Sequence, residues 1–226
     1  MRFPPLFNPK PRTIVLLKVL VWIALFLPLL WLVYGAATNN LGANPLSEIE
    51  HVTGEWTLRV ILFSLAITPL RRILKWNWLI RFRRLLGLFG FFYASVHFFC
   101  YLWFDQNFVW SSIVADIAKR RFIYVGFAAW LTLVPLAATS TAASIRKLGG
   151  KRWNTLHKLA YLCAVLGVIH FYWGQKADHS DPIIFGSILL LLFAIRIWYA
   201  LRKDSSPPRG KSPARKDTPI LVANPR

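Results

Sequence analysis

The chain has 226 residues, 56% of them apolar, with a formal net charge of +19 at pH 7 and a mean hydropathy of +0.44. Soluble domains are rarely this apolar, so the composition argues against an ordinary globular enzyme and indicates a protein that crosses a membrane several times. The basic residues stand in short blocks between long apolar runs, as membrane-flanking residues do. No RNA-binding motif or separate basic domain is visible, which argues against nucleic-acid binding.

Six apolar runs are long enough to cross about 30 Å of hydrocarbon as helices of about 20 residues. Each backbone polar group in lipid needs an internal partner, so these runs are expected to be helical. The expected spans cover residues 13–34, 56–74, 85–104, 122–139, 155–173 and 182–201. Pro28, Pro69 and Pro135 fall within them, where neighbouring helices can tolerate a kink. The sequence therefore predicts an all-α membrane protein, a bundle of six transmembrane helices.

The segments that connect the predicted spans lie alternately on the two sides of the membrane, and Lys and Arg are concentrated on one side. The N-terminus, the loops after the second and fourth spans, and the C-terminal tail are all basic, whereas residues 35–55 contain no Lys or Arg. The positive-inside rule then predicts that both termini are cytoplasmic. The run from Lys119 to Arg121 is the one exception to this pattern.

Composition divides the chain into three parts. A short cytoplasmic segment covers residues 1–12, the transmembrane domain covers 13–201, and a tail covers 202–226. The tail is rich in proline and basic residues and cannot bury enough apolar surface to order itself, so it is expected to be disordered near the inner leaflet. Cys100 and Cys163 lie inside apolar runs, which favours small core residues over a disulfide or a zinc site.

Two histidines occupy the third and fifth spans, which run in the same direction. His97 lies roughly 10 Å from the outer end of its span, and His170 lies about four residues from the outer end of its own, so their depths are similar. An ionisable residue inside a span is costly and its default interpretation is functional. Imidazole is a common ligand of haem iron, and helical bundles place cofactors between facing helices. The pair is therefore a candidate for axial ligation of one haem, with a core histidine bonded to a carbonyl as the alternative.

Small residues near the two histidines would let a flat macrocycle approach the helices. They are Gly87, Gly90, Ala94, Ala160, Ala164 and Gly167. Iron held by two histidines has no open position for oxygen, which suits electron transfer.

His157 lies near the inner end of the fifth span, roughly 20 Å from His170. On a straight helix the two rings would point some 140° apart, which favours two sites at different depths. A second haem is one role for His157 and a structural role is the other. Its partner ligand is unclear, because Arg83 and Arg84 stand where a second histidine of the third span would be expected.

Other polar residues carry weaker signals. His51 and His179 are expected in outer loops as solvated side chains, and Arg59 and Arg196 are expected to snorkel to an interface. No GxGxxG segment or P-loop is present, so electrons must come from a partner or a membrane-soluble carrier such as quinol.

Several segments together resemble the MsrQ (YedZ) family, the haem-binding membrane subunits of a bacterial methionine sulfoxide reductase system with a ferric-reductase-like membrane domain. The resemblance covers roughly residues 12–200. It is carried by "HVTGEWTLR", "ITPLRR", "IRFRRLLGLFGFFYASVHF" and "LAATSTAASIRKLGGKRWNTLHKLAYLCAVLGVIHFYW".

The resemblance implies a multi-pass haem b subunit of the bacterial inner membrane, with FMN also assigned in that family. Its electrons come from the quinone pool or a flavin reductase and pass to the periplasmic molybdopterin reductase MsrP, where methionine sulfoxide is reduced. Catalysis would then take place on the partner. His97, His157 and His170 match the family's histidines by position, whereas no flavin pocket can be placed. Two alternatives stay open: a ferric or quinone reductase of the same fold, and a cofactor-free membrane anchor or transporter.

Overall fold

The computed structural model describes residues 9–204, and these residues form helices and short connections with no β-strand among them. The long helices of this range are α1 (Pro11–Ala37), α2 (Pro45–Leu74), α3 (Arg83–Cys100), α5 (Arg121–Ala138), α8 (Leu159–Gly174) and α9 (Ser180–Asp204). The shorter elements are the 3-10 helix η1 (Asn77–Phe82), the π-helical turn η2 (Tyr101–Asp105), α4 (Trp110–Lys119), α6 (Ala142–Leu148) and α7 (Gly150–Leu156). The predicted all-α class is confirmed.

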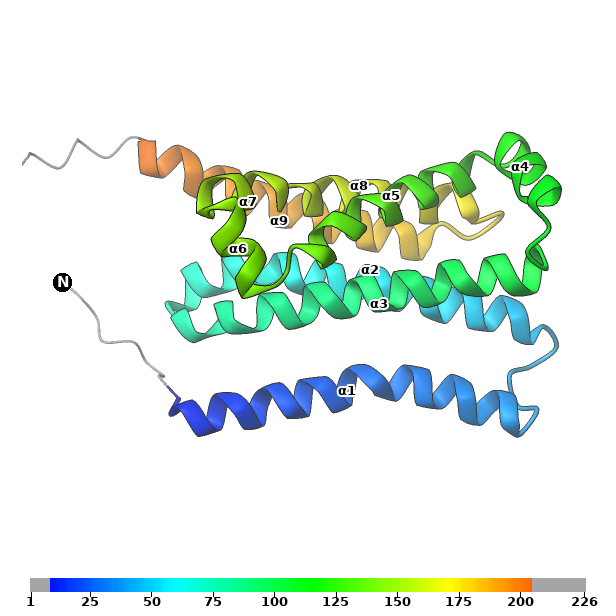
Figure 1. Cartoon of the computed structure of the whole chain (residues 1–226), viewed down its shortest axis with the longest axis horizontal. Helices are drawn as coiled ribbons and strands as arrows, with labels where there is room; N and C mark the ends of the chain where they lie inside the picture. Colours follow the sequence, from blue (N-terminus) through cyan, green and yellow to red (C-terminus); the bar gives the residue numbers. More distant parts are fainter. Residues whose placement is uncertain (1–8, 205–226) are drawn as a thin grey trace, which may run out of the picture.

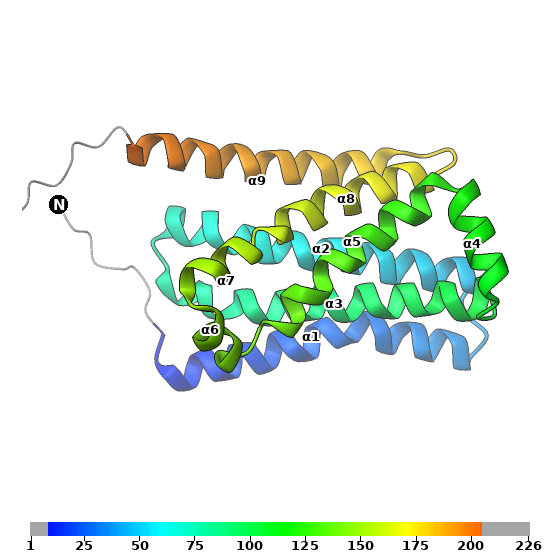
Figure 2. The same ribbon diagram turned by 45° about the horizontal axis from the view of Figure 1, so that its top comes forward.

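The long helices run side by side in one elongated bundle, with α1 at its edge (Figures 1 and 2). The start of α1, the α2–α3 connection, α6, α7 and the end of α9 lie together at one end, which we call the basic end because these segments hold most of the described Lys and Arg residues. The α1–α2 loop, α4 and the α8–α9 connection lie at the opposite end, called the far end. The start of α1 and the end of α9 thus share one end of the bundle. That this end faces the cytoplasm stays a prediction.

Five helical stretches of the described chain are long and apolar enough to cross a membrane: Pro11–Ala37, Asn77–Asp105, Arg121–Ala138, Gly150–Gly174 and Ser180–Arg202. Large apolar side chains cover the outside of the bundle, where Leu16 is 58% and Leu190 is 70% exposed. Such a surface is stable only against lipid. The chain is therefore a multi-pass membrane protein.

The second expected span corresponds to α2, which packs against α3. Its charged residues Glu55 and Arg59 lower its hydropathy, and the count of six spans stays a prediction. The helix begins at Pro45, well before the expected start at residue 56, because Asn44 caps it by accepting a hydrogen bond from the Ser47 amide at 3.3 Å.

Two further boundaries differ from the expected ones. The fifth span is interrupted, since α7 ends at Leu156 and α8 begins at Leu159. The single straight helix that was assumed for the angle between His157 and His170 is therefore not present. At the other boundary, α9 continues to Asp204, so the first residues of the expected tail are helical. The rest of the tail, residues 205–226, lies outside the described residues, as do residues 1–8.

A short amphipathic helix, α4, covers the far end between α3 and α5. Asp116 on this helix accepts hydrogen bonds from the Tyr101 hydroxyl and the Gln106 amide, each at 3.0 Å, and pairs with Arg120. The bond to Asp116 raises the pKa of Arg120 above its ordinary value. The neighbouring Arg121 lies over the Trp173 ring, 5.8 Å from its centroid. Two of the three basic residues that break the charge pattern are thus held by contacts within the far end.

The interior is apolar, with a few buried polar anchors. Tyr93 is fully buried, and its hydroxyl donates a 2.6 Å hydrogen bond to the Leu25 carbonyl, which ties α3 to α1. Cys100 and Cys163 are buried and unpaired, as predicted.

Candidate functional site

The structure brings His97 and His170 together near the far end of the bundle. Their ring centroids lie 6.0 Å apart, with the planes at 78° to each other. His97 stands in the last turn of α3 and His170 in the last turns of α8. Both side chains are partly buried among apolar neighbours, and the Phe122 ring lies 5.9 Å from that of His170.

Each of the two imidazoles has one nitrogen occupied by the backbone of a neighbouring helix. His97 Nδ1 lies 3.0 Å from the Glu50 carbonyl oxygen on α2, with the Thr53 hydroxyl 3.3 Å away. His170 Nδ1 lies 2.7 Å from the Phe122 carbonyl oxygen on α5. A carbonyl oxygen only accepts, so in both rings Nδ1 carries the proton and donates. The lone pair of a neutral ring is then on Nε2, which is how second-shell carbonyls prepare histidines for metal binding.

Two glycines on the helices that do not carry these histidines allow the rings to lie against the backbone. A Cβ added to Gly126 on α5 would stand 2.5 Å from His170 Nδ1, closer than real Cβ contacts. A Cβ added to Gly54 on α2 would stand 3.2 Å from His97 Cε1. Any larger residue at Gly126 would displace the imidazole.

Sequence reasoning missed both of these glycines. Of the small residues it selected, Gly90 packs against Ile61 and Gly167 against Leu58, while Gly87 and Ala160 line the cavity described below. A glycine inside a helix is about 1 kcal/mol less favourable than an alanine. Glycines within the apolar helices could therefore have indicated positions where another group lies close to the backbone.

His157 lies apart from this pair, in the break between α7 and α8 near the basic end. Its ring stacks on Trp153 with centroids 3.8 Å apart, and its Nε2 lies 3.2 Å from the Thr139 hydroxyl. That hydroxyl donates to the Pro135 carbonyl at 2.6 Å, so it accepts from His157. The Trp153 indole in turn donates to the Thr139 carbonyl at 2.9 Å. His157 is thus held by two contacts, the stacked Trp153 ring and the Thr139 hydroxyl, and these two partners are themselves joined by a hydrogen bond.

A cavity of about 370 Å³ opens beside His157. Its wall combines apolar side chains of α2, α3 and α5 with the polar residues Ser64, Arg83, Arg84, Ser140, Asn154 and His157. Among the described residues that line it, His157 is the one with a side chain that commonly ligates haem iron. We call this space the inner cavity.

The other two histidines, His51 and His179, and the in-span arginines Arg59 and Arg196 make contacts of their own. His51 lies 3.3 Å from Glu55, which also pairs with Arg59 at 2.5 Å. His179 is at the far end, 3.3 Å from the Ala177 carbonyl. The expectation that Arg196 snorkels is wrong.

Arg196 turns inward and donates to the Tyr161 hydroxyl at 2.8 Å and to the Leu65 carbonyl at 2.5 Å. These contacts explain how a charged residue of α9 is accommodated between helices rather than at the membrane surface.

Residues 53–168 match the family described as "ferric reductase like transmembrane component", a region that includes His97 and His157. Relatives match over nearly the whole chain. A protein-methionine-sulfoxide reductase heme-binding subunit MsrQ of Herminiimonas arsenicoxydans is 48% identical over 88% of this chain and 92% of its own length.

The chain belongs to the MsrQ family. Two further MsrQ proteins with the same full name support the assignment. The one from Rhodospirillum rubrum is 48% identical over 87% of this chain and 93% of its own length. The one from Ralstonia nicotianae is 45% identical over 85% of this chain and 89% of its own length. Because the MsrQ relatives are covered almost end to end, the likeness is to whole proteins of this family.

Proposed function

We propose that the chain is the haem b electron-transfer subunit of a protein-methionine-sulfoxide reductase, with His97 and His170 as the axial ligands of one haem. The observation that carries the proposal is the pair of facing imidazoles with Nδ1 bound to backbone carbonyls and Nε2 left to ligate. The relatives' names, which describe haem-binding subunits of such a reductase, support it.

The residues present fit a haem at this place. The 6.0 Å between the ring centroids would leave room for one iron ion held by both imidazoles, because a metal–imidazole bond is about 2 Å long. Because Gly54 and Gly126 have no side chain, the imidazoles of His97 and His170 can lie against the backbone of α2 and α5. Bound haem b supplies reversible one-electron chemistry to the site.

The protein residues around the pair hold the ligands and limit access. The Glu50 and Phe122 carbonyls fix the ring orientation and raise the basicity of Nε2. With both histidines as its protein ligands, a haem here would suit electron transfer rather than oxygen chemistry. Apolar neighbours such as Phe122, whose ring lies 5.9 Å from that of His170, would limit solvent access to a bound haem and so influence its redox potential.

The position of the pair gives the proposed direction of transfer. The pair lies toward the far end, which the positive-inside rule assigns to the periplasm. A haem at this depth shortens the distance to a soluble periplasmic acceptor, here an MsrP-type molybdopterin reductase. The donor is a quinol from the membrane pool or a cytoplasmic flavin reductase. Methionine sulfoxide would be reduced on the partner.

His157 and the inner cavity are proposed as a second cofactor site toward the donor side. A second haem would have His157 as its protein ligand, and Arg83 and Arg84 are placed to pair with propionates. The same arginines would suit the phosphate of FMN. Ligation by His157 Nε2 requires release of its contact with Thr139.

The test uses the full chain purified in detergent. Reduced-minus-oxidised visible spectra and pyridine haemochrome quantification are recorded for the wild type and for His97→Ala, His170→Ala and His157→Ala. His179→Ala, which replaces a partly exposed histidine at the far end, is the matched control. We expect a low-spin b-type spectrum that quinol can reduce, with loss of the same haem in the first two variants and none in the control. A folded wild type without haem after haem-supplemented expression contradicts the proposal and favours a cofactor-free anchor or transporter.

A further inference from the structure

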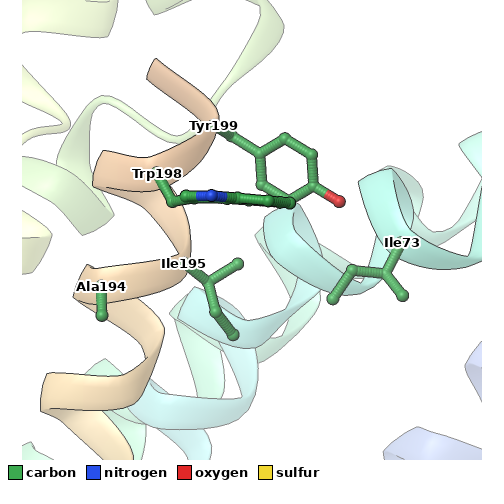
Figure 3. Close-up of a pocket in the computed structure, with 5 residues that line it drawn as sticks. All are labelled: Ile73, Ala194, Ile195, Trp198 and Tyr199. Atoms are coloured by element: carbon green, nitrogen blue, oxygen red, sulfur yellow. The ribbon is translucent and has the colours of Figure 1, made fainter. Parts of the chain in front are cut away.

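A shallow groove lies between α2 and α9 at the basic end, with a volume of about 460 Å³. One wall is Ile73 of α2, and α9 supplies Ala194, Ile195, Trp198 and Tyr199 (Figure 3). The lining is almost wholly apolar, yet Ile73 is 52% and Trp198 is 46% exposed. These residues of α9 belong to the last turns of a membrane-spanning stretch, so the groove opens toward lipid rather than water.

Two arginines stand beside the aromatic wall of this groove. The Arg72 guanidinium lies 5.6 Å from the Tyr199 ring centroid, and that of Arg202 lies 3.8 Å from the Trp198 ring. The two rings are themselves only 4.9 Å apart, at 74°. The aromatic faces therefore hold both cations at the mouth of one apolar groove.

We propose that this groove binds a phospholipid with an anionic head group, with an acyl chain along Ile73 and Ile195 and the phosphate at Arg72 and Arg202. A guanidinium binds phosphate oxygens in a two-pronged geometry, and basic pockets between transmembrane helices at the cytoplasmic side are known to take anionic head groups. A neutral lipid or a quinone would fill the apolar part of the groove but would make no ion pair with Arg72 or Arg202. Because the lipid contacts both α2 and α9, it stabilises their packing at the basic end. This site is independent of the proposed haem.

The test compares two lipids with identical acyl chains, phosphatidylglycerol and phosphatidylcholine, on the delipidated full chain in detergent. Native mass spectrometry counts bound lipid, and thermal unfolding with lipid titration gives apparent affinity. The double variant Arg72→Gln/Arg202→Gln is compared with Arg12→Gln/Arg146→Gln, which removes the same charge from exposed positions elsewhere at the basic end.

We expect the wild type and the control pair to prefer phosphatidylglycerol. The double variant should lose about thirtyfold in affinity for it, or about fivefold for each arginine. The two single variants are measured as well, so the result does not depend on the folding of the double variant. Trp198→Ala should weaken both lipids, because it removes part of the groove itself.

Two results would overturn the proposal. One is equal wild-type affinity for the two lipids, which would make the groove a non-selective lipid contact. The other is an equal loss in the control pair, which would assign the preference to the diffuse charge of the basic end rather than to the groove.

Discussion

Replacing Gly126 by alanine tests how the His97–His170 pair is held. The added Cβ would stand 2.5 Å from His170 Nδ1 and 2.6 Å from its Cε1, so the imidazole must move. Movement breaks the 2.7 Å bond to the Phe122 carbonyl, which fixes the ring. Loss of such a second-shell contact typically lowers metal affinity by 10- to 100-fold. We expect haem affinity at the far-end site to fall at least about tenfold.

The assay is the haem-to-protein ratio of detergent-purified protein at limiting haem, with circular dichroism to establish folding. Gly54→Ala should lose less haem, because its Cβ would lie 3.2 Å from His97 Cε1 and a small shift suffices. Gly186→Ala is the matched control, since its Cβ would lie 3.4 Å from Val168 in ordinary contact. A full haem complement with an unchanged spectrum in folded Gly126→Ala would refute the reasoning.

Three further variants test other parts of the structure. Tyr93→Phe removes the buried bond to the Leu25 carbonyl and should lower the free energy of unfolding by about 1 kcal/mol, measured by thermal denaturation in detergent; an unchanged stability would contradict the anchoring role. Asp116→Ala removes the acceptor that holds α4 and should speed proteolysis of the far end, with haem content as the control. Trp153→Ala removes the ring stacked on His157 and should change only the visible spectrum of a cofactor bound in the inner cavity. A change in the spectrum of the far-end haem would argue against two separate sites.

The sequence was sufficient to predict the helical bundle, because long apolar runs allow few other structures in lipid. The ends of the helices were harder to predict where a helix continues beyond its apolar run. The first turns of α2 contain Ser47 and Glu48 and have no apolar run, yet a capping Asn44 starts the helix there. The break at His157 was missed because no glycine or proline adjoins it, and its immediate neighbours Leu156 and Lys158 are good helix formers.

The candidate site was predictable in part for a similar reason. Matching depth in two spans of the same direction singled out His97 and His170, but depth says nothing about which neighbouring helix faces each ring. Gly54 and Gly126 act on the histidines across helix contacts, so their role depends on packing that no local pattern encodes. Arg196 was misjudged because its acceptors, Tyr161 and the Leu65 carbonyl, come from two other helices.

The most direct test of the central claim is low-temperature electron paramagnetic resonance of the oxidised wild type beside His97→Gly and His170→Gly, with and without added imidazole. The account predicts a low-spin ferric signal of bis-histidine type in the wild type, lost in each variant and restored by imidazole. A wild-type signal that survives both substitutions in folded protein would show that the iron is held elsewhere, and would contradict the assignment of the pair as axial ligands.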